Sequence, residues 1–423
     1  MSEIAVVGSG YVGLTTAACM ASFGHSVLGI DIDTDKIERL QRAELPFFEP
    51  GLPELVKDGI DEGRLRFSAD HADAATSEFV FLCVPTPPLP DGSADRSYLV
   101  EAAQALSRHL GDGAVVIVKS TVPVGSAALL EEQIARSDIA VVSNPEFLRE
   151  GHAVEDCRRP DRLVIGSDDA AVAARVIALY EGLDVPAVVT DPVTAELTKY
   201  AANAFLALKL SYMFEIAAVC ELVGADVADV AAGLGHDRRI GADYLRPGPG
   251  WGGSCLPKDT RALDAISRDA GHDFVLLRSA IEVNEIQVRR VVDKVRTALD
   301  GPIDGARISI LGLAFKAGTD DVRESPSLRV IECLVGLGAD IAVHDPMVSA
   351  NTVVPDAERF DTALAAAAGA DVVVVMTEWE EYRVLDFEAL ASVMAGGVVV
   401  DTRNHLPRDE VRRSGLRHVG TGR

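Results

Sequence analysis

The chain has 423 residues, of which 48% are hydrophobic and 25% are charged, and its formal net charge is −25. This length allows two or three domains, and the composition is typical of a globular protein. The negative charge argues against nucleic acid as a partner, because phosphate binding requires an excess of basic groups. Since no run of about 18 apolar residues occurs, we also expect no membrane span.

The cysteines and histidines give no sign of a metal site. The six cysteines are scattered without a CxxC pair, and the nine histidines form no cluster with ligand spacing. This pattern argues against zinc and against a disulfide framework, and it favours a reducing compartment. The chain also goes directly into a strand at residues 4–7, without a basic signal region. We therefore expect a cytoplasmic protein without a metal.

The N-terminal residues predict a nucleotide-binding unit. A strand at residues 4–7 runs into the sequence GSGYVG, and a helix at 14–23 and a second strand at 26–31 follow. This is the Rossmann fingerprint, in which the glycines admit a pyrophosphate and the acid that ends the second strand, Asp31, binds ribose. An acid there repels a 2′-phosphate, so NAD is favoured over NADP. The cofactor residues of this unit are Gly8, Gly10, Tyr11, Val12, Gly13 and Asp31.

Further strands continue the same sheet. They are predicted at residues 79–84, 114–118 and 139–142. Thr86, Thr121 and Glu146 follow the ends of these strands. Because ligands of a doubly wound sheet lie beyond the carboxyl ends of its strands, we expect these three side chains to line one crevice.

The middle of the chain predicts a long helix at residues 194–223, followed by a shorter one at 226–234. Apolar residues cover most faces of the long helix, which indicates burial in a domain junction or in a dimer interface. Lys199 and Asn203 lie four residues apart and therefore on one face. A buried lysine without a task is rare, so we expect this face to be functional.

The C-terminal part repeats the strand order of the N-terminal part, with strands predicted at residues 307–312, 340–345, 371–376 and 397–401. Its first turn lacks the GxGxxG pattern, so we expect a different nucleotide there, with Lys316 supplying positive charge. The fold class predicted for the whole chain is α/β, with two Rossmann-like doubly wound domains joined by a long central helix and a helical dimerisation region.

The sequence GGSCLPKD at residues 252–259 contains the strongest candidate nucleophile. Cys255 ends a glycine-rich loop, and Lys258 and Asp259 follow within one helical turn. A cation near a thiol favours the reactive thiolate, and a carboxylate can act as a base or position water. Taken alone, the spacing favours an inert buried cysteine before a helix. The nucleotide-binding pattern on both sides of it favours the nucleophile.

Together these motifs resemble the UDP-glucose/GDP-mannose dehydrogenase family over nearly the whole chain. The resemblance rests on residues 8–13, 49–52, 119–124, 144–151, 199–205, 239–241, 252–259 and 315–326. It implies an NAD-binding domain at residues 1–193, a central dimerisation domain at 194–300 and a nucleotide-sugar-binding domain at 301–423. It also implies a homodimer or a higher homo-oligomer.

The resemblance implies a four-electron oxidation of a hexose C6 alcohol to a carboxylate. Cys255 attacks the intermediate aldehyde, and the thiohemiacetal is oxidised to a thioester that water hydrolyses. Lys199 and Asn203 stabilise charge on the C6 oxygen. The residues expected to position or activate water are Asp259, Thr121 and Glu146.

The resemblance also implies binding residues outside the glycine-rich turn. Those for the cofactor are Lys36, Pro85, Thr86, Thr121, Glu150, Lys258 and Arg323. Those for the substrate are Glu146, Phe147, Leu148, Glu150, Lys199, Asn203, Arg239, Tyr244, Gly252, Lys316 and Arg403. In an acidic chain, the basic residues among them supply the local charge that a diphosphate needs.

The substrate expected from the resemblance is UDP-glucose, with GDP-mannose as the alternative. Residues 160–162 and 239–241 resemble the UDP-glucose branch, whereas 244–248 resemble the GDP-mannose branch. Trp251 stands where the family more often has phenylalanine or tyrosine, which suggests a tighter sugar pocket. Thr402 stands where glycine is usual in the family, so the backbone of the following Arg403 is expected to differ from the family pattern.

Other classes of function fit the sequence less well. Acetamido-sugar relatives differ in the motif at residues 144–151. A non-catalytic sensor of NAD or of a nucleotide sugar needs no nucleophile, and neither does a two-electron alcohol dehydrogenase.

Overall fold

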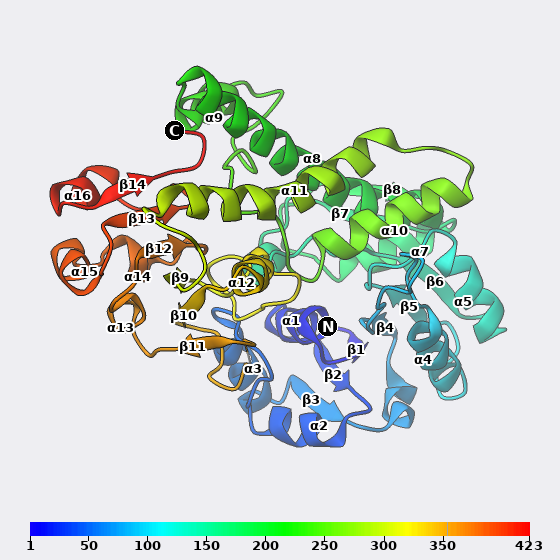
Figure 1. Ribbon diagram of the computed structural model, residues 1–423. Helices are drawn as coiled ribbons and strands as arrows, with labels where there is room; N and C mark the ends of the chain where they lie inside the picture. The colour runs from blue at the N-terminus through cyan, green and yellow to red at the C-terminus, as the bar shows by residue number, and fades with distance from the viewer. Residues whose placement is uncertain (353) are drawn as a thin grey trace. The chain divides into compact units, whose positions relative to one another are not determined.

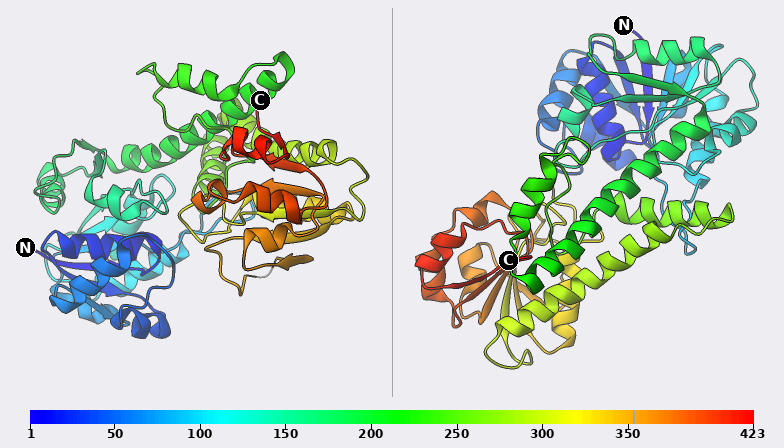
Figure 2. Two further views of the ribbon diagram at one scale, coloured as in Figure 1. Left: turned by 90° about the vertical axis from the view of Figure 1, so that its left-hand side faces the viewer. Right: turned by 90° about the horizontal axis from the view of Figure 1, so that it is seen from above.

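The computed structural model describes residues 1–352 and 354–423 (Figure 1). The chain forms two compact units. The first unit comprises Met1–Ala202 and Arg261–His272, and the second comprises Asn203–Thr260 and Asp273–Arg423. Each unit contains a largely parallel sheet with helices on both faces, which confirms the predicted fold class (Figures 1 and 2).

The sheet of the first unit has the strand order β3-β2-β1-β4-β5-β6-β7-β8. Its strands are β1 (Glu3–Val7), β2 (Ser26–Ile30), β3 (Leu65–Ser68), β4 (Phe79–Leu82), β5 (Val115–Val118), β6 (Ala140–Ser143), β7 (Leu163–Gly166) and β8 (Ala187–Thr190). Neighbouring strands are parallel, except that β6 meets β7 in an antiparallel pairing. Because β1 lies between β2 and β4, the strand order reverses beside the glycine-rich turn, where such sheets bind their ligands.

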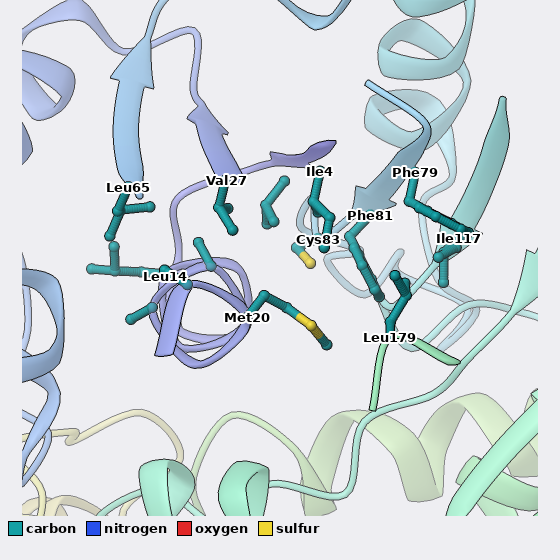
Figure 3. Packing of buried hydrophobic residues seen from close by; sticks show 14 of the residues in the cluster. Ile4, Leu14, Met20, Val27, Leu65, Phe79, Phe81, Cys83, Ile117 and Leu179 are labelled. Atoms are coloured by element: carbon teal, nitrogen blue, oxygen red, sulfur yellow. The ribbon is translucent and has the colours of Figure 1, made fainter. Parts of the chain in front are cut away.

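Helices cover both faces of this sheet because its central strands, such as β4 and β5, are buried along their whole length. The helices are α1 (Tyr11–Ser22), α2 (Thr34–Gln41), α3 (Leu52–Asp61), the 3₁₀ helix η1 (His71–Thr76), α4 (Ser97–Ser107), α5 (Ser126–Ile134), α6 (Ala153–Arg158) and α7 (Ala170–Ala178). Figure 3 shows one face, where Leu14 and Met20 of α1 pack against strand residues such as Ile4 and Phe81.

Two features of the first unit differ from the sequence prediction. Helix α1 begins at Tyr11 rather than at residue 14, because Gly10 is its N-cap and the last part of the glycine-rich turn is already helical. Strands β3, β7 and β8 were not predicted. β3 (LRFS) alternates apolar and polar residues and carries no apolar run. β7 (LVIG) and β8 (AVVT) are apolar in sequence but only four residues long, and runs this short do not distinguish a strand from a helix.

The sheet of the second unit has the order β11-β10-β9-β12-β13-β14, with parallel pairings. Its strands are β9 (Arg307–Leu311), β10 (Asp340–His344), β11 (Ala357–Arg359), β12 (Val372–Val375), β13 (Val398–Asp401) and β14 (Arg417–Val419). The four predicted strands are β9, β10, β12 and β13. The two at the edges, β11 and β14, are short and were missed.

Helices also surround the second sheet. They are α9 (Val227–Gly235), α11 (Val275–Ala298), α12 (Pro326–Gly336), α13 (Ala363–Ala367), α14 (Glu380–Arg383), α15 (Phe387–Val393) and α16 (Arg408–Arg413). Helix α10 (Leu256–Asp269) begins in the second unit, and from Arg261 onward it belongs to the first. Side chains of α11 and α12 pack on one face, and those of α13 and α15 pack on the other.

The predicted central helix is α8 (Pro192–Val223), which is 32 residues long. It begins in the first unit and continues into the second. In the second unit one side of α8 is buried through Ala207, Phe214 and Ala217, while Phe205 and Val219 lie exposed on another side. The apolar residues of α8 are therefore divided between the core and the surface.

Candidate active site

The glycine-rich turn is tightly packed at Gly8 and Gly13 and leaves open space at Gly10. Gly8 has φ +95°, and a Cβ on it would lie 2.5 Å from the carbonyl oxygen of Cys83. A Cβ on Gly13 would lie 1.7 Å from the Gly8 oxygen, so neither position tolerates a side chain. A Cβ on Gly10, the N-cap of α1, would meet nothing within 4 Å. This arrangement suits a pyrophosphate at the N-terminus of α1, where backbone N–H groups are available.

Asp31 directly follows β2 and places a carboxylate beside the glycine-rich turn. Its carboxylate accepts hydrogen bonds from Ser9 N at 2.8 Å and from Lys36 Nζ at 2.9 Å. Burial raises the pKa of Asp31, but the hydrogen bonds from Lys36 and from backbone N–H groups bring that pKa below its usual range. The group is therefore ionised at neutral pH, which disfavours a cofactor with a 2′-phosphate.

Tyr11 and Val12 have structural contacts in addition to their place in the turn. Val12 packs against the core. The Tyr11 hydroxyl donates to Glu49, a fully buried carboxylate. Glu49 also accepts from Gly151 N and from Ala153 N, each at 2.7 Å. Glu49 thus ties the glycine-rich turn to the segment that carries Glu146 and Glu150, a role that the motif around residue 49 does not reveal.

Lys199 and Glu146 form a buried ion pair in the first unit. Lys199 Nζ lies 2.8 Å from Glu146 Oε1, and both side chains are 4% exposed. Burial raises the pKa of Glu146, but the charge and hydrogen bond of Lys199 bring that pKa below its usual range. The Phe147 ring lies 5.4 Å from Lys199 Nζ, and Leu148 N donates to Glu146 at 2.6 Å. Glu146 is therefore a weak base that is well suited to hold a cation or a water molecule.

The ends of β4 and β5 bring two predicted residues together. The Thr86 hydroxyl donates to the Thr121 carbonyl oxygen at 2.8 Å. Thr86 is buried and the preceding Pro85 is exposed, whereas Glu150, after β6, is buried. Thr86 and Thr121 therefore meet at one edge of the sheet, as the strand order predicts.

Cys255 directly precedes α10 in the second unit. Its thiol is partly exposed and lies 3.5 Å from the Ser254 hydroxyl. The Cys255 carbonyl oxygen accepts from Asp259 N at 2.8 Å, which begins the helix. A thiol at a helix N-terminus is favoured as the thiolate, because the helix dipole stabilises negative charge there.

The glycines before Cys255 are required by close packing. Gly253 has φ +82°, and a Cβ on it would lie 2.7 Å from the Phe315 ring. A Cβ on Gly252 would lie 2.3 Å from the Glu324 carbonyl oxygen. Gly253 N also donates to the Arg323 carbonyl oxygen at 3.0 Å. The loop is therefore fixed against the first turn of the C-terminal sheet, and this fixes the backbone that precedes Cys255.

Asp259 connects Asn203 with Lys258. It accepts from Asn203 Nδ2 at 2.6 Å through one oxygen and from Lys258 Nζ at 2.6 Å through the other, and it is fully buried. The predicted cation near Cys255 thus forms an ion pair with Asp259. Because α8 is continuous, Lys199 lies one turn before Asn203 on the same helix.

Arg403 is held firmly despite the threonine before it. The buried Thr402 hydroxyl donates to the Val375 carbonyl oxygen at 2.7 Å. Arg403 Nε donates to the Met376 carbonyl oxygen at 2.9 Å, and Nη2 donates to the Phe315 carbonyl oxygen at 2.8 Å. Thr402 therefore anchors the loop, and Arg403 lies beside the turn that contains Lys316.

The remaining predicted residues are more exposed. Arg239 pairs with Asp237 at 2.6 Å, and its side chain is 89% exposed. Arg323 is also exposed and pairs with Asp321 at 2.6 Å. Tyr244 is partly buried and has a positive φ of 61°.

Trp251 is a core residue of the second unit. It is buried, and its indole N–H donates to the Ser211 hydroxyl of α8 at 3.0 Å. Its ring belongs to a cluster with Ala207 and Phe214. The identity of the side chain at this position is thus explained by packing against α8.

Among residues 1–352 and 354–423, no helix combines the length and apolar character that crossing a membrane requires. Within the same described ranges, no group of three or more His, Cys, Asp or Glu side chains is arranged to hold a metal ion.

Comparison with known proteins gives matches along the whole chain. Residues 2–184 match the NAD binding domain of the UDP-glucose/GDP-mannose dehydrogenase family, residues 193–286 match its central domain, and residues 309–408 match its UDP binding domain. The chain is 44% identical to a UDP-glucose 6-dehydrogenase of Rhizobium meliloti, over 100% of this chain and 99% of that protein. It is 41% identical to UDP-glucose 6-dehydrogenase YwqF of Bacillus subtilis, over 100% and 98% of the two chains.

A solved structure supports the same relationship. The UDP-glucose dehydrogenase from the hyperthermophilic archaeon Pyrobaculum islandicum superposes with a TM-score of 0.92 at 37% identity. The superposition covers 99% of this chain and 97% of that one.

Proposed function

Because the chain belongs to the UDP-glucose/GDP-mannose dehydrogenase family, we propose that it oxidises UDP-glucose to UDP-glucuronate through a covalent Cys255 intermediate. The observation that carries this proposal is the position of Cys255, at the N-terminus of α10 and at the end of a closely packed glycine loop. The choice of UDP-glucose as the substrate follows the relatives named above, which are UDP-glucose 6-dehydrogenases. Their substrate is a nucleotide sugar whose C6 alcohol is two oxidation steps away from the acid.

NAD is the cofactor, and the residues of the first unit fit it. Gly8 and Gly13 close the turn, Gly10 leaves room for the pyrophosphate, and the ionised Asp31 suits ribose hydroxyl groups. When bound, NAD⁺ accepts a hydride in each of the two oxidations. We further propose Lys36, Pro85, Thr86, Glu150, Lys258 and Arg323 as cofactor residues.

The Cys255 sulfur adds to the C6 aldehyde and gives a thiohemiacetal. This adduct has a carbon–hydrogen bond from which hydride can leave, whereas the free aldehyde does not lose hydride readily. Loss of the hydride gives a thioester, and attack by water releases the acid and restores the thiol. The overall reaction consumes two NAD⁺ and one water for each UDP-glucose.

The surrounding polar residues stabilise charge and position water. Lys199 and Asn203 stabilise the developing charge on the C6 oxygen, because each donates hydrogen bonds from a buried position. Asp259, Thr121 and Glu146 position the water that hydrolyses the thioester. The lowered pKa of Glu146 suits an acceptor that stays ionised throughout the reaction. The other substrate residues proposed are Phe147, Leu148, Glu150, Arg239, Tyr244, Gly252, Lys316 and Arg403.

The stoichiometry of the reaction tests this proposal. We expect two NADH for each UDP-glucose consumed and no accumulation of free aldehyde, because the thiohemiacetal retains the intermediate until it becomes an acid. NADH absorbance measured at limiting UDP-glucose, with chromatography of the products, gives the ratio. A ratio of one, with an aldehyde as product, would rule out the cysteine mechanism.

The choice of sugar nucleotide is a separate prediction. We expect a higher kcat/KM for UDP-glucose than for GDP-mannose, since Arg239 and its neighbours resemble the UDP-glucose branch and residues 309–408 match a UDP binding domain. Steady-state rates with both substrates at equal enzyme concentration give the comparison. A preference for GDP-mannose would reverse the assignment and leave the mechanism intact.

We also propose that the enzyme is a homodimer or a higher oligomer built on α8. Phe205, Tyr212 and Val219 recur every seven residues and are 62%, 57% and 51% exposed, so they form an apolar stripe along the helix. An exposed stripe of this kind is typical of a surface that a partner covers. A second copy of the chain is the occupant that the family resemblance implies.

Charge substitutions in the stripe test the assembly. We expect Phe205→Glu and Val219→Glu to convert the oligomer to monomer, because a carboxylate is costly to bury at an apolar interface. Light scattering at assay concentration gives the mass. Val384→Glu is the matched control, since Val384 is 72% exposed and lies outside α8, and it should leave the mass unchanged. An active parental monomer would contradict the proposal.

Two further assignments remain proposals. The division into domains at residues 1–193, 194–300 and 301–423 is supported by the three family matches, which fall within these ranges except that the central one begins at residue 193. A cytoplasmic location is supported by the free cysteines, since a reducing compartment maintains thiols.

A further inference from the structure

Glu196, near the start of α8, is a buried carboxylate that the reaction proposed above does not use. Its residue is 3% exposed. Gly125 N donates to one of its oxygens at 2.6 Å, and Ala127 N donates to the other at 2.9 Å. The Ser143 hydroxyl also donates to this second oxygen, at 3.2 Å. Glu196 therefore ties α8 to two segments of the first unit that are distant in the sequence.

Each of the segments that Glu196 joins carries a residue of the proposed active site. Thr121 lies four residues before the first N–H group that Glu196 binds. Glu146 lies three residues after the hydroxyl that Glu196 binds. Lys199 lies three residues after Glu196 and therefore on the same face of α8. Glu196 thus lies where the segments that carry Thr121, Glu146 and Lys199 meet.

The segment between Thr121 and α5 is short and is held at both ends. At one end, the Thr86 hydroxyl donates to the Thr121 carbonyl oxygen at 2.8 Å. At the other end, the N-cap of α5 is Gly125, which has φ +87° and no side chain to accept from the first N–H groups of the helix. Glu196 supplies that acceptor from α8. Since Pro123 restricts the backbone between the two ends, the position of Thr121 depends on both anchors.

The start of α8 is itself firmly placed on the sheet. Gly166 ends β7, and a Cβ on it would lie 2.6 Å from the Ala195 Cβ, so helix and strand are in close contact. Ala195 is fully buried. One turn further along, Lys199 forms its ion pair with Glu146. The Glu196 carboxylate is therefore a fixed point against which the Thr121 segment is set.

We propose that Glu196 is a positioning residue, which sets Thr121 against the ion pair of Lys199. From there Thr121 holds the water that hydrolyses the Cys255 thioester, so this inference rests on the function proposed above. In that step the water oxygen bonds to C6 and the C6–sulfur bond breaks, and the two protons of the water go to the sulfur and to solvent. Glu196 touches none of the reacting atoms and acts through Thr121.

Glu196→Gln tests the proposal with little change of shape. A carboxylate accepts through both oxygens, whereas the amide turns an NH₂ group toward one of the donors that Glu196 binds. We expect kcat to fall by about 10²-fold, the loss that a shift of about 1 Å in a positioned group can cause. Because hydrolysis becomes the slow step, the thioester on Cys255 should accumulate and be seen by intact mass after acid quenching. Glu132→Gln, which removes an exposed charge from α5, is the matched control and should change neither kcat nor the adduct.

A double-variant cycle shows whether Glu196 acts through Thr121. Thr121→Ala should accumulate the same thioester. Combining it with Glu196→Gln should lower kcat no further, because the residue that Glu196 positions is already absent. If the two losses multiply, Glu196 supports the fold independently of Thr121 and the proposal is overturned. If Thr121→Ala hydrolyses the thioester at the parental rate, the proposal also fails, while the cysteine mechanism stands.

A measurement on the resting parental enzyme needs neither substrate nor a folded variant. Amide hydrogen exchange, resolved to single residues, should show Gly125 N and Ala127 N protected, because both donate to a buried carboxylate. Exchange of these two groups as fast as that of exposed loops would overturn the proposal. The ratio of NADH to UDP-glucose in the parental enzyme tests the proposed function separately, so the failure of one is distinguishable from the failure of the other.

Discussion

Cys255→Ala is expected to eliminate the formation of UDP-glucuronate, with kcat reduced by on the order of 10⁴-fold or more, as for other enzymes that lose a covalent nucleophile. The thiol forms the adduct from which the second hydride leaves, and alanine offers no atom for that bond. NAD and UDP-glucose should still bind, because Cys255 is one side chain at the edge of a loop that its glycines fix. Product chromatography and calorimetric titration of both ligands separate the two effects.

The other cysteines provide the matched controls for this experiment. Serine variants at these positions should retain activity under reducing conditions, because the proposed reaction does not use their sulfur atoms. They are Cys19, Cys83, Cys157, Cys220 and Cys333. If Cys255→Ala made the acid at the parental rate, the nucleophile would have to be sought among these five.

The fold could be predicted where the sequence shows long apolar strands next to glycine-rich turns. Both sheets, the turn at residues 8–13 and the helix α8 are predicted in this way, since buried central strands and helix periodicity leave clear patterns. The edge strands β3, β11 and β14 could not be found, because they are short and partly exposed, and the short apolar strands β7 and β8 were also missed. Their pairing depends on neighbours that are distant in the sequence.

The candidate site shows a similar division between what sequence motifs reveal and what packing adds. Helical spacing places Lys199 and Asn203 on one face, but it does not reveal that their partners are Glu146 and Asp259. These contacts join residues more than fifty positions apart in the chain, so no local pattern encodes them. The support that Glu49 gives to the Glu146 segment was missed for the same reason.

Lys199→Met is expected to lower kcat by about 10²- to 10³-fold, because it removes a preorganised donor to the C6 oxygen in a buried site. It should also destabilise the fold by roughly 3–5 kcal/mol, since it leaves the buried Glu146 carboxylate without its cation. These two losses have different causes. The first concerns charge in the transition state, and the second concerns an unpaired charge in the native protein.

A double variant separates the two losses. Lys199→Met combined with Glu146→Gln removes both charges of the 2.8 Å ion pair, so much of the thermal stability lost in the single variant should return. The activity should not return, because the amide supplies no cation near the C6 oxygen. Thermal unfolding and steady-state kinetics of the parent, both single variants and the double variant give the complete cycle. If the double variant regained both stability and kcat, Lys199 would be a structural partner of Glu146 rather than a catalytic residue.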